Sequence, residues 1–280
     1  MEQILKNEDL NHQLDKNGFL KVSFLPMEAV NAIQSLYLET IEAHERIGKV
    51  QAFHATQDCA NLELSRYVDK RAKEILSPYV AKHFANYRII MANFILKSPG
   101  EASRLSPHQD WTFVDESKYA TFGFWTPVED TNKENGNLQF LPGSHRLERT
   151  LRVNYNYPCA FSEVLDLAEK HMMDVCTKKG DSVILNHSVL HASHPNMSGQ
   201  TRVALSLGIT HKNAQLYHYY SDDGRTVYRY KINLEVLQGL KYMVKPSDEF
   251  LDEVFTFKFP IVSKTRLQHW LDGINVGSDV

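Results

Sequence analysis

Two side chains that commonly bind metals stand two residues apart, at His108 and Asp110. In an extended strand, side chains two residues apart point to the same face, so both groups can reach one ion. A third imidazole from a distant strand, with His191 as the candidate, completes two histidines and one carboxylate. Such a set leaves other positions on the ion open for small ligands. These residues predict a mononuclear metal site.

Three histidines compete for the third ligand position, because His187 and His194 flank His191. Only His191 is followed by a serine two residues later, Ser193, and by an arginine eleven residues later, Arg202. If the turn of a hairpin lies between residues 197 and 198, Ser193 falls opposite Arg202. A guanidinium is a rigid fork of donors that matches a carboxylate. We therefore expect a clamp for a dicarboxylic co-substrate beside the metal, and this ligand set is typical of non-haem iron(II) oxygenases.

These residues, together with the segments between them, resemble the phytanoyl-CoA dioxygenase family. The segments that carry the resemblance are Asn17-Gly18-Phe19, His108-Gln109-Asp110, Asn135-Gly136-Asn137-Leu138-Gln139-Phe140-Leu141-Pro142-Gly143-Ser144-His145, His191-Ala192-Ser193 and Arg202. Apart from the first, they lie within about residues 87–212. The resemblance implies a mainly β protein with flanking helices, built on a double-stranded β-helix core of the jelly-roll, cupin-like type.

The resemblance also implies roles for individual residues. His108, Asp110 and His191 would be catalytic and bind Fe(II), whereas the distal carboxylate of 2-oxoglutarate would be held by Arg202 and Ser193. Trp125 would lie against this co-substrate. Gln109 and Asn93 are implied as further cofactor-binding residues of the pocket, in contact with the co-substrate or the substrate.

The activity implied is a dioxygenase reaction that uses O2 as second co-substrate. An unactivated C–H bond of a small metabolite would be hydroxylated while 2-oxoglutarate is decarboxylated to succinate and CO2. Halogenation is disfavoured, because halogenating relatives replace the carboxylate that Asp110 supplies here. Desaturation or ring closure by the same oxidant remains open. A jelly-roll zinc isomerase or hydrolase and a catalytically silent binding module are the less favoured alternatives.

Short apolar runs separated by turn residues follow Asn86 and predict strands of a sandwich or barrel. They span residues 87–97, 121–128, 138–141, 182–186, 203–210 and 217–220. Helical spacing predicts helices after Pro26 and over residues 62–84, where Pro78 favours a break into two. Residues 48–61 are interpreted as an ordinary connection, with a loop over a pocket as the alternative, and residues 161–174 as an inserted helix. We expect one domain with a helical part over residues 1–86, a jelly-roll core over 87–220 and a C-terminal extension over 221–280.

The substrate is expected to be a small metabolite, amino-acid-derived or otherwise carboxylate-bearing. Arg225 and Arg229 could clamp such a carboxylate. Further candidates for contact are aromatic residues and a histidine that follow the ligands or lie in the connection, namely Trp111, Phe113, Phe53 and His54.

Composition excludes several function classes. A net charge of −3 and the lack of long Lys and Arg runs argue against nucleic acid, and no 18 consecutive apolar residues predict a membrane span. Cys59, Cys159 and Cys176 lack the CxxC spacing of thiolate zinc sites or a disulfide framework. We expect a cytoplasmic protein, and the sequence does not predict its oligomeric state.

Overall fold

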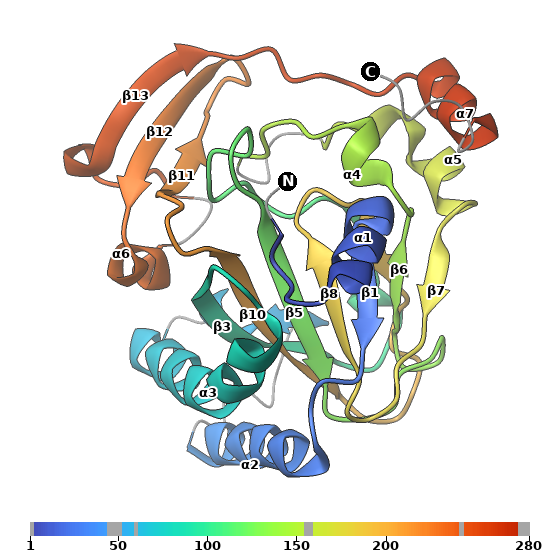
Figure 1. Ribbon diagram of the computed structural model, residues 1–280, viewed down its shortest axis with the longest axis vertical. Helices are drawn as coiled ribbons and strands as arrows, with labels where there is room; N and C mark the ends of the chain where they lie inside the picture. Colours follow the sequence, from blue (N-terminus) through green and yellow to red (C-terminus); the bar gives the residue numbers. More distant parts are fainter. Residues whose placement is uncertain (1–2, 44–51, 59–60, 154–158, 241–243, 274–280) are drawn as a thin grey trace.

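Two antiparallel sheets form the centre of the protein, shown in Figure 1 as a computed structural model. The structure describes residues 3–43, 52–58, 61–153, 159–240 and 244–273. The six-stranded sheet contains, in spatial order, β1 (Phe19–Val22), β8 (Ser182–Asn186), β5 (Thr121–Pro127), β10 (Arg202–His211), β3 (Tyr87–Lys97) and β2 (Phe53–Ala55). The four-stranded sheet contains β4 (Leu105–His108), β9 (His191–Ser193), β6 (Leu138–Phe140) and β7 (Met173–Val175). This arrangement confirms the predicted jelly-roll core.

Three helices precede most of the strands: α1 (Glu8–Asn17), α2 (Met27–Ala43) and α3 (Leu62–His83). Asn7 and Asn61 cap α1 and α3, because each side chain accepts a hydrogen bond from the backbone N–H three residues later. Ile33 of α2 and Leu76 of α3 are fully buried in the same apolar cluster as Leu205 of β10. This burial holds the helices on the outer face of the six-stranded sheet, where Figure 1 shows α2 and α3 together.

The predicted break at Pro78 is wrong, because α3 continues through it from Leu62 to His83. Proline removes one backbone donor and crowds the preceding turn. Leu76 and Val80 on either side of it are nevertheless buried in the core, at 0% and 1% exposure. Packing of this apolar face therefore outweighs the local cost of the proline.

Residues 48–61 also differ from the prediction of a simple connection. Within the described part, residues 53–55 form β2 and residues 56–58 form a short 3-10 helix, η1 (Thr56–Asp58). β2 extends the six-stranded sheet by pairing Phe53 with Lys97 and Ala55 with Ile95. The segment thus forms one edge of the sheet.

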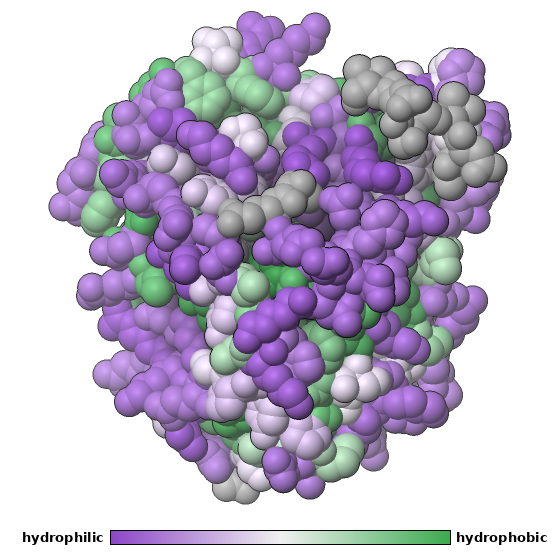
Figure 2. All heavy atoms as spheres, viewed as in Figure 1, coloured by the Kyte–Doolittle hydropathy of each residue, from purple (hydrophilic) through white to green (hydrophobic). Residues whose placement is uncertain are grey.

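The predicted strand at residues 217–220 exists, but it lies outside the jelly-roll. It is part of β11 (Leu216–Tyr220), which pairs with β12 (Thr226–Ile232), and β12 pairs with β13 (Leu251–Thr256) in a separate sheet. Figure 1 shows this three-stranded sheet at the upper left. Figure 2 shows a mostly hydrophilic face, with hydrophobic residues at the upper left over the same sheet. Leu251 and Val254 are 38% and 48% exposed there.

The remaining elements are short. They are η2 (Glu101–Ser103), α4 (Ser144–Leu147), η3 (Ser162–Val164), α5 (Leu165–Glu169), α6 (Leu234–Gly239), η4 (Asp248–Phe250) and α7 (Lys264–Asp272). The helix predicted over residues 161–174 is therefore shorter, and its last residues begin β7. Among the described residues, no helix combines the length and apolar character that crossing a membrane requires.

Asp69 ties three elements together beneath the sheet. Its carboxylate accepts hydrogen bonds from the backbone N–H of Ala92 in β3 and from Lys73 in α3, both at 2.7 Å, and from the amide of Gln238 in α6. The residue is 5% exposed. It therefore supplies acceptors that water does not replace.

We predict that Asp69→Ala lowers the free energy of unfolding by about 3 kcal/mol, because it leaves a buried N–H and a lysine without their acceptor. Urea denaturation measures this change. Lys70→Ala, a change of an exposed charge at the next position of the same helix, is the control and should have little effect. Equal effects of the two substitutions would contradict the role given to Asp69.

Candidate functional site

The two histidines and the aspartate predicted to bind metal lie together at one end of the four-stranded sheet. The register of β4 against β9 places His108 opposite His191, and Asp110 follows just beyond β4. The Asp110 oxygens lie 3.7 Å from His108 Nε2 and 3.8 Å from His191 Nε2. One ligand atom from each residue lies within 4.8 Å of the other two, and among the described residues this is the one group of its kind. A single ion can therefore contact all three.

Backbone carbonyls orient both imidazoles. The Nδ1 atoms of His108 and His191 lie 2.8 Å from the Ser106 carbonyl and 3.1 Å from the Val189 carbonyl. Each Nδ1 is assigned as the N–H donor, which leaves the Nε2 lone pair facing Asp110. This tautomer is the one that binds a metal through Nε2.

Burial and neighbouring charges set the protonation of the site. Burial, followed by the charge of His191, lowers the pKa of His108 to about 4. Burial favours neutral Asp110, but the nearby charges of His191, His187 and His108 outweigh it and hold the pKa of Asp110 below its ordinary value. At neutral pH His108 is therefore a neutral imidazole and Asp110 a carboxylate, the forms in which both bind metals.

Arg152 positions the aspartate, a role that sequence reasoning did not predict. Its Nε donates to the Asp110 backbone carbonyl at 2.7 Å, and its two terminal nitrogens contact the Glu116 carboxylate at 2.5 and 2.6 Å. The residue is 6% exposed, so this is a buried, bidentate ion pair. The ion pair with Glu116 holds the Arg152 side chain in place, and Arg152 in turn holds the backbone carbonyl of Asp110.

A cavity of about 170 Å³ lies between the two sheets and contains the three candidate ligands in its wall. Arg202 also lines it and is 1% exposed. Its Nε and Nη1 have no hydrogen-bond partner among the described residues, and its Cζ lies 5.1 Å from the centre of the Trp125 ring. Burial lowers the pKa of Arg202 to about 10, so the guanidinium stays charged at neutral pH. A buried cation with unpaired donors suits a carboxylate ligand.

The predicted hairpin between Ser193 and Arg202 is wrong, although both residues line the cavity. Ser193 pairs with Leu105 and Leu138 in the four-stranded sheet, whereas Arg202 pairs with Lys97 in the six-stranded sheet. The chain crosses from one sheet to the other between them. The two side chains therefore approach the cavity from opposite walls.

Four further candidates line the same cavity: Phe53, Asn93, Trp111 and Phe113. His54 does not line it, because it alternates with Phe53 and Ala55 on β2 and so points to the other face of the sheet. Burial lowers the pKa of His54.

Gln109 lies apart from the Arg202 cavity. Its amide donates to the carbonyls of Glu148 and Ser188 at 3.1 and 2.6 Å. It lines a second cavity, of about 270 Å³, which shares His108, Asp110 and Trp111 with the first. The first cavity contains Arg202 in its wall, whereas the second contains the candidate ligands His108 and Asp110 without Arg202.

The two arginines of the C-terminal extension do not reach either of these cavities. Arg229 is paired with Asp252 and Glu253 at 2.6 and 2.8 Å and stacks on Tyr217. Arg225 is exposed in the turn before β12. Both belong to the three-stranded sheet, whose separate position the sequence did not reveal.

The two alternative ligands have other contacts. His194 Nε2 lies 2.7 Å from the Asp174 carboxylate, outside the candidate metal group. His187 lines the cavity, with its Nδ1 3.4 Å from the Trp111 carbonyl and its ring edge-on to Phe113.

Other lining residues that sequence reasoning missed come from β3, β10 and η1: Met91, Ser206 and Gln57. Alternation along the predicted strand 87–97 could have placed Met91 on the face of Asn93.

Lys97 is a second buried cation beside Arg202, and the two contrast in their contacts. Its Nζ donates to the carbonyls of Ser103 and His194, at 2.7 and 2.5 Å, and the residue is 0% exposed. Burial and the charge of Arg202 lower the pKa of Lys97 to about 7. The amine can donate to both carbonyls in either protonation state.

We predict that replacing these two cations by methionine has opposite effects on ligand-free protein. Arg202→Met should raise the free energy of unfolding by about 1 kcal/mol or more, because it removes a buried charge with unpaired donors. Lys97→Met should lower it by about 2 kcal/mol, because two carbonyls lose their donor. Urea denaturation compares both variants with the parent protein. A strong loss of stability in Arg202→Met would mean that the guanidinium is satisfied in solution.

Comparison with known proteins identifies the family. The family model "Phytanoyl-CoA dioxygenase (PhyH)" matches residues 15–204, more than half of the chain. Phytanoyl-CoA dioxygenase 1 of Oryza sativa subsp. japonica is 33% identical over 128 residues, and the match covers 43% of this chain and 44% of that protein. The chain thus matches less than half the length of this curated relative.

Solved structures share the fold. The apo form of ThoJ, described as a non-heme monooxygenase, superposes with a TM-score of 0.57 at 15% identity and covers 95% of both chains. The epimerase SnoN in complex with Fe3+, alpha ketoglutarate and nogalamycin RO gives a TM-score of 0.52 at 19% identity, over 75% of this chain and 85% of that one. At these identities the likeness is one of fold. The family model, which matches residues 15–204, shows that this chain belongs to the phytanoyl-CoA dioxygenase family.

Proposed function

We propose that this protein is a non-haem Fe(II)- and 2-oxoglutarate-dependent dioxygenase that hydroxylates a C–H bond of a small molecule. One observation carries the proposal: a group of two histidines and one carboxylate shares a cavity with a buried guanidinium that has unpaired nitrogens. The first feature fits a metal with open positions. The second fits the far end of a dicarboxylate. A co-substrate that binds the metal at one end and the guanidinium at the other would fit this cavity.

The donor set fits iron. His108, Asp110 and His191 would hold Fe(II), and the carbonyls of Ser106 and Val189 keep their ring nitrogens in the binding tautomer. Iron(II) bound with 2-oxoglutarate and O2 supplies the oxidising chemistry, coupled to decarboxylation of 2-oxoglutarate to succinate and CO2.

The protein residues bind and orient the reactants. Arg202 would donate Nε–H and Nη1–H to the distal carboxylate of 2-oxoglutarate, with Ser193 opposite and Trp125 beneath the guanidinium. Ser193 and Trp125 are 2% and 4% exposed, so water is largely excluded from this end. Exclusion of water strengthens the ion pair that the co-substrate makes.

Desaturation or ring closure would use the same site and the same oxidant, and remain alternatives to hydroxylation. A zinc isomerase or hydrolase is less well supported, because it has no need of the Arg202 clamp. We also propose that residues 1–280 act as one oxygenase domain. A reducing cytoplasm suits iron(II) and the free thiols of Cys159 and Cys176.

We predict that anaerobic addition of Fe(II) and 2-oxoglutarate produces the weak visible charge-transfer band of the metal chelate. His191→Ala should abolish the band, whereas His194→Ala, a change of the neighbouring histidine paired with Asp174, should keep it. Arg202→Met should require about 10- to 100-fold more 2-oxoglutarate, because charged hydrogen bonds to one carboxylate are lost. Absorbance titration measures all three variants. Absence of the band in the parent protein, with zinc tightly retained, would favour the zinc enzyme.

We predict that Asp110→Ala abolishes the slow formation of succinate from 2-oxoglutarate and O2 that occurs without substrate. The carboxylate supplies one of three metal ligands, so its loss weakens metal binding and leaves two imidazoles. Chromatographic measurement of succinate tests this expectation. Asp115→Ala is the matched control, because Asp115 contacts Ser117 and lies outside the cavity. Unchanged succinate formation in Asp110→Ala would remove Asp110 from the ligand set.

A further inference from the structure

Two glycines lie next to each other on adjacent strands of the six-stranded sheet and line the main cavity. In the six-stranded sheet, the register pairs Gly123 of β5 with Leu185 on one side and Gly208 of β10 on the other. Gly208 in turn pairs with Met91 of β3. All four residues line the cavity. The two central positions of this cross-strand row therefore carry no side chain, and the row forms a trough with Leu185 and Met91 at its ends.

Side chains at these two positions would collide with Leu185 and Met91, whose side chains lie against the glycines. A Cβ on Gly208 would lie 2.9 Å from Met91 Cγ, and a Cβ on Gly123 would lie 2.8 Å from Leu185 Cδ2. The register of β10 against β3 also shifts between Gly208 and Ile209. Such irregularities often occur beside active sites, where they redirect the chain.

The trough is separate from the end of the cavity that holds the guanidinium. Gly208 lies six residues from Arg202 on the same strand, which corresponds to about 20 Å. This distance is much longer than a five-carbon dicarboxylate. A co-substrate held by Arg202 therefore leaves the glycine row uncovered.

The surroundings of the trough are apolar and uncharged. Phe113 is 3% exposed and packs in one cluster with Met91. His187, whose pKa burial lowers, is edge-on to Phe113. Among the described residues that line the cavity, Asp110 is the one carboxylate residue and Arg202 the one lysine or arginine. No cation is available here for a substrate carboxylate.

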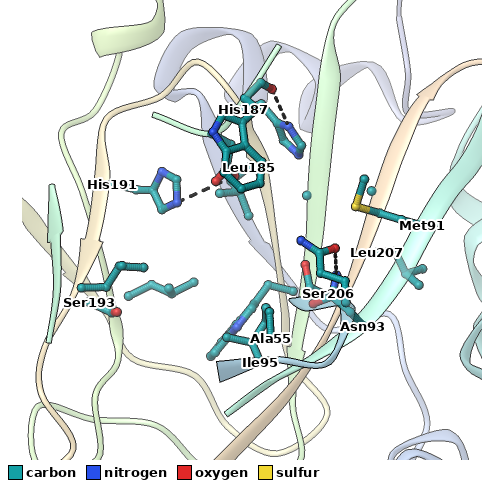
Figure 3. A pocket seen from close by; sticks show the side chains of 18 of the residues that line it. Ala55, Met91, Asn93, Ile95, Leu185, His187, His191, Ser193, Ser206 and Leu207 are labelled. Carbon is teal, nitrogen blue, oxygen red and sulfur yellow. Dashed lines mark hydrogen bonds and ion pairs between the residues drawn. The ribbon is translucent and has the colours of Figure 1, made fainter. Parts of the chain in front are cut away.

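A polar atom without a partner lies beside the trough. Asn93 is 5% exposed, lines the cavity and pairs with Ser206 in the next row of the sheet. Its Nδ2 donates to Gln57 Oε1 at 3.0 Å, whereas its Oδ1 has no hydrogen-bond partner among the described residues. Figure 3 shows Met91, Asn93 and Ser206 on one side of the pocket and His191 and Ser193 on the other. Buried acceptors are normally paired, so Asn93 Oδ1 is suited to a donor on a ligand.

We propose that the glycine trough binds the substrate to be oxidised, and that this part of the substrate is uncharged, apolar and flat, with one O–H or N–H group that donates to Asn93 Oδ1. The proposal rests on the proposed function, because it assigns the substrate end of the same cavity. It replaces the carboxylate-bearing substrate that the sequence suggested, since Arg225 and Arg229 lie away from the cavity. Gly123 and Gly208 determine specificity because they let Leu185 and Met91 lie close against the sheet, which keeps these two side chains from filling the cavity.

The experiment uses protein loaded with Zn(II) and 2-oxoglutarate, so that no oxidation occurs. The probe is N-phenyl-1-naphthylamine, which is uncharged, aromatic and carries one N–H group, and whose fluorescence rises in apolar sites. The parent protein should bind it saturably. Gly208→Val should raise its Kd about tenfold or more, because the added carbons push Met91 away from the sheet and into the apolar cavity. Asn93→Ala should raise the Kd about fivefold through loss of one hydrogen bond.

Two further variants keep the test decisive. Met91→Trp fills the trough from one end without changing a glycine. It should also raise the Kd of the probe, and it tests the proposal if Gly208→Val does not fold. Gly199→Val is the matched control, because a Cβ there meets no atom within 4 Å, and it should leave the Kd unchanged. For each variant the Fe(II) and 2-oxoglutarate chelate band is recorded in parallel and should match that of the parent protein.

The outcomes separate this proposal from the one on which it rests. If the chelate band forms but the probe does not bind, or binds equally to the parent protein, Gly208→Val and Met91→Trp, the trough is not the substrate site. If the chelate band does not form in the parent protein, the proposed function itself fails. Loss of probe binding in the trough variants alone, with the chelate band intact, supports the assignment.

Discussion

The antiparallel register of β10 against β3 and β5 is the constraint on which the site depends. Because side chains alternate along a strand, this register turns Arg202, Ser206 and Gly208 toward the cavity and sends Leu205 and Ile209 into the core beneath the helices. A slip of one residue would exchange the two faces and bury the guanidinium under α2 and α3. The apolar packing of the helices therefore also fixes the position of the Arg202 guanidinium.

The four-stranded sheet contributes the candidate metal ligands, and the cavity connects them to Arg202. Pairing of β4 with β9 sets His108 beside His191, and Arg152 holds the backbone of Asp110 from behind. A charged guanidinium with unpaired donors is costly in a dry interior. A ligand that neutralises Arg202 would therefore raise the free energy of unfolding, which would link the stability of the fold to ligand binding at this residue.

Much of this site could be predicted from the sequence, because its signals are local. The chain shows directly that Asp110 follows His108 by two residues and that Ser193 and Arg202 follow His191 by two and eleven. Runs of alternating apolar residues likewise predicted most of the strands. The missed features depend on pairing between distant segments. Ser193 and Arg202 share a cavity but not a hairpin, Phe53 lies on an edge strand, and Arg229 is held in a separate sheet by Asp252. The trough could not be predicted from the sequence either, because Gly123 and Gly208 become neighbours only through the register of the sheet.

The central claim is that one small dicarboxylate contacts both the metal and Arg202 in a single cavity. The most direct measurement is calorimetric titration of 2-oxoglutarate into the protein with and without Mn(II), a divalent ion that can replace iron without turnover. The account predicts that Mn(II) strongly raises the affinity for 2-oxoglutarate and, by linkage, that 2-oxoglutarate raises the affinity for Mn(II) to the same degree. Equal affinity for 2-oxoglutarate with and without the metal would contradict it, because the co-substrate would then not bridge the two groups.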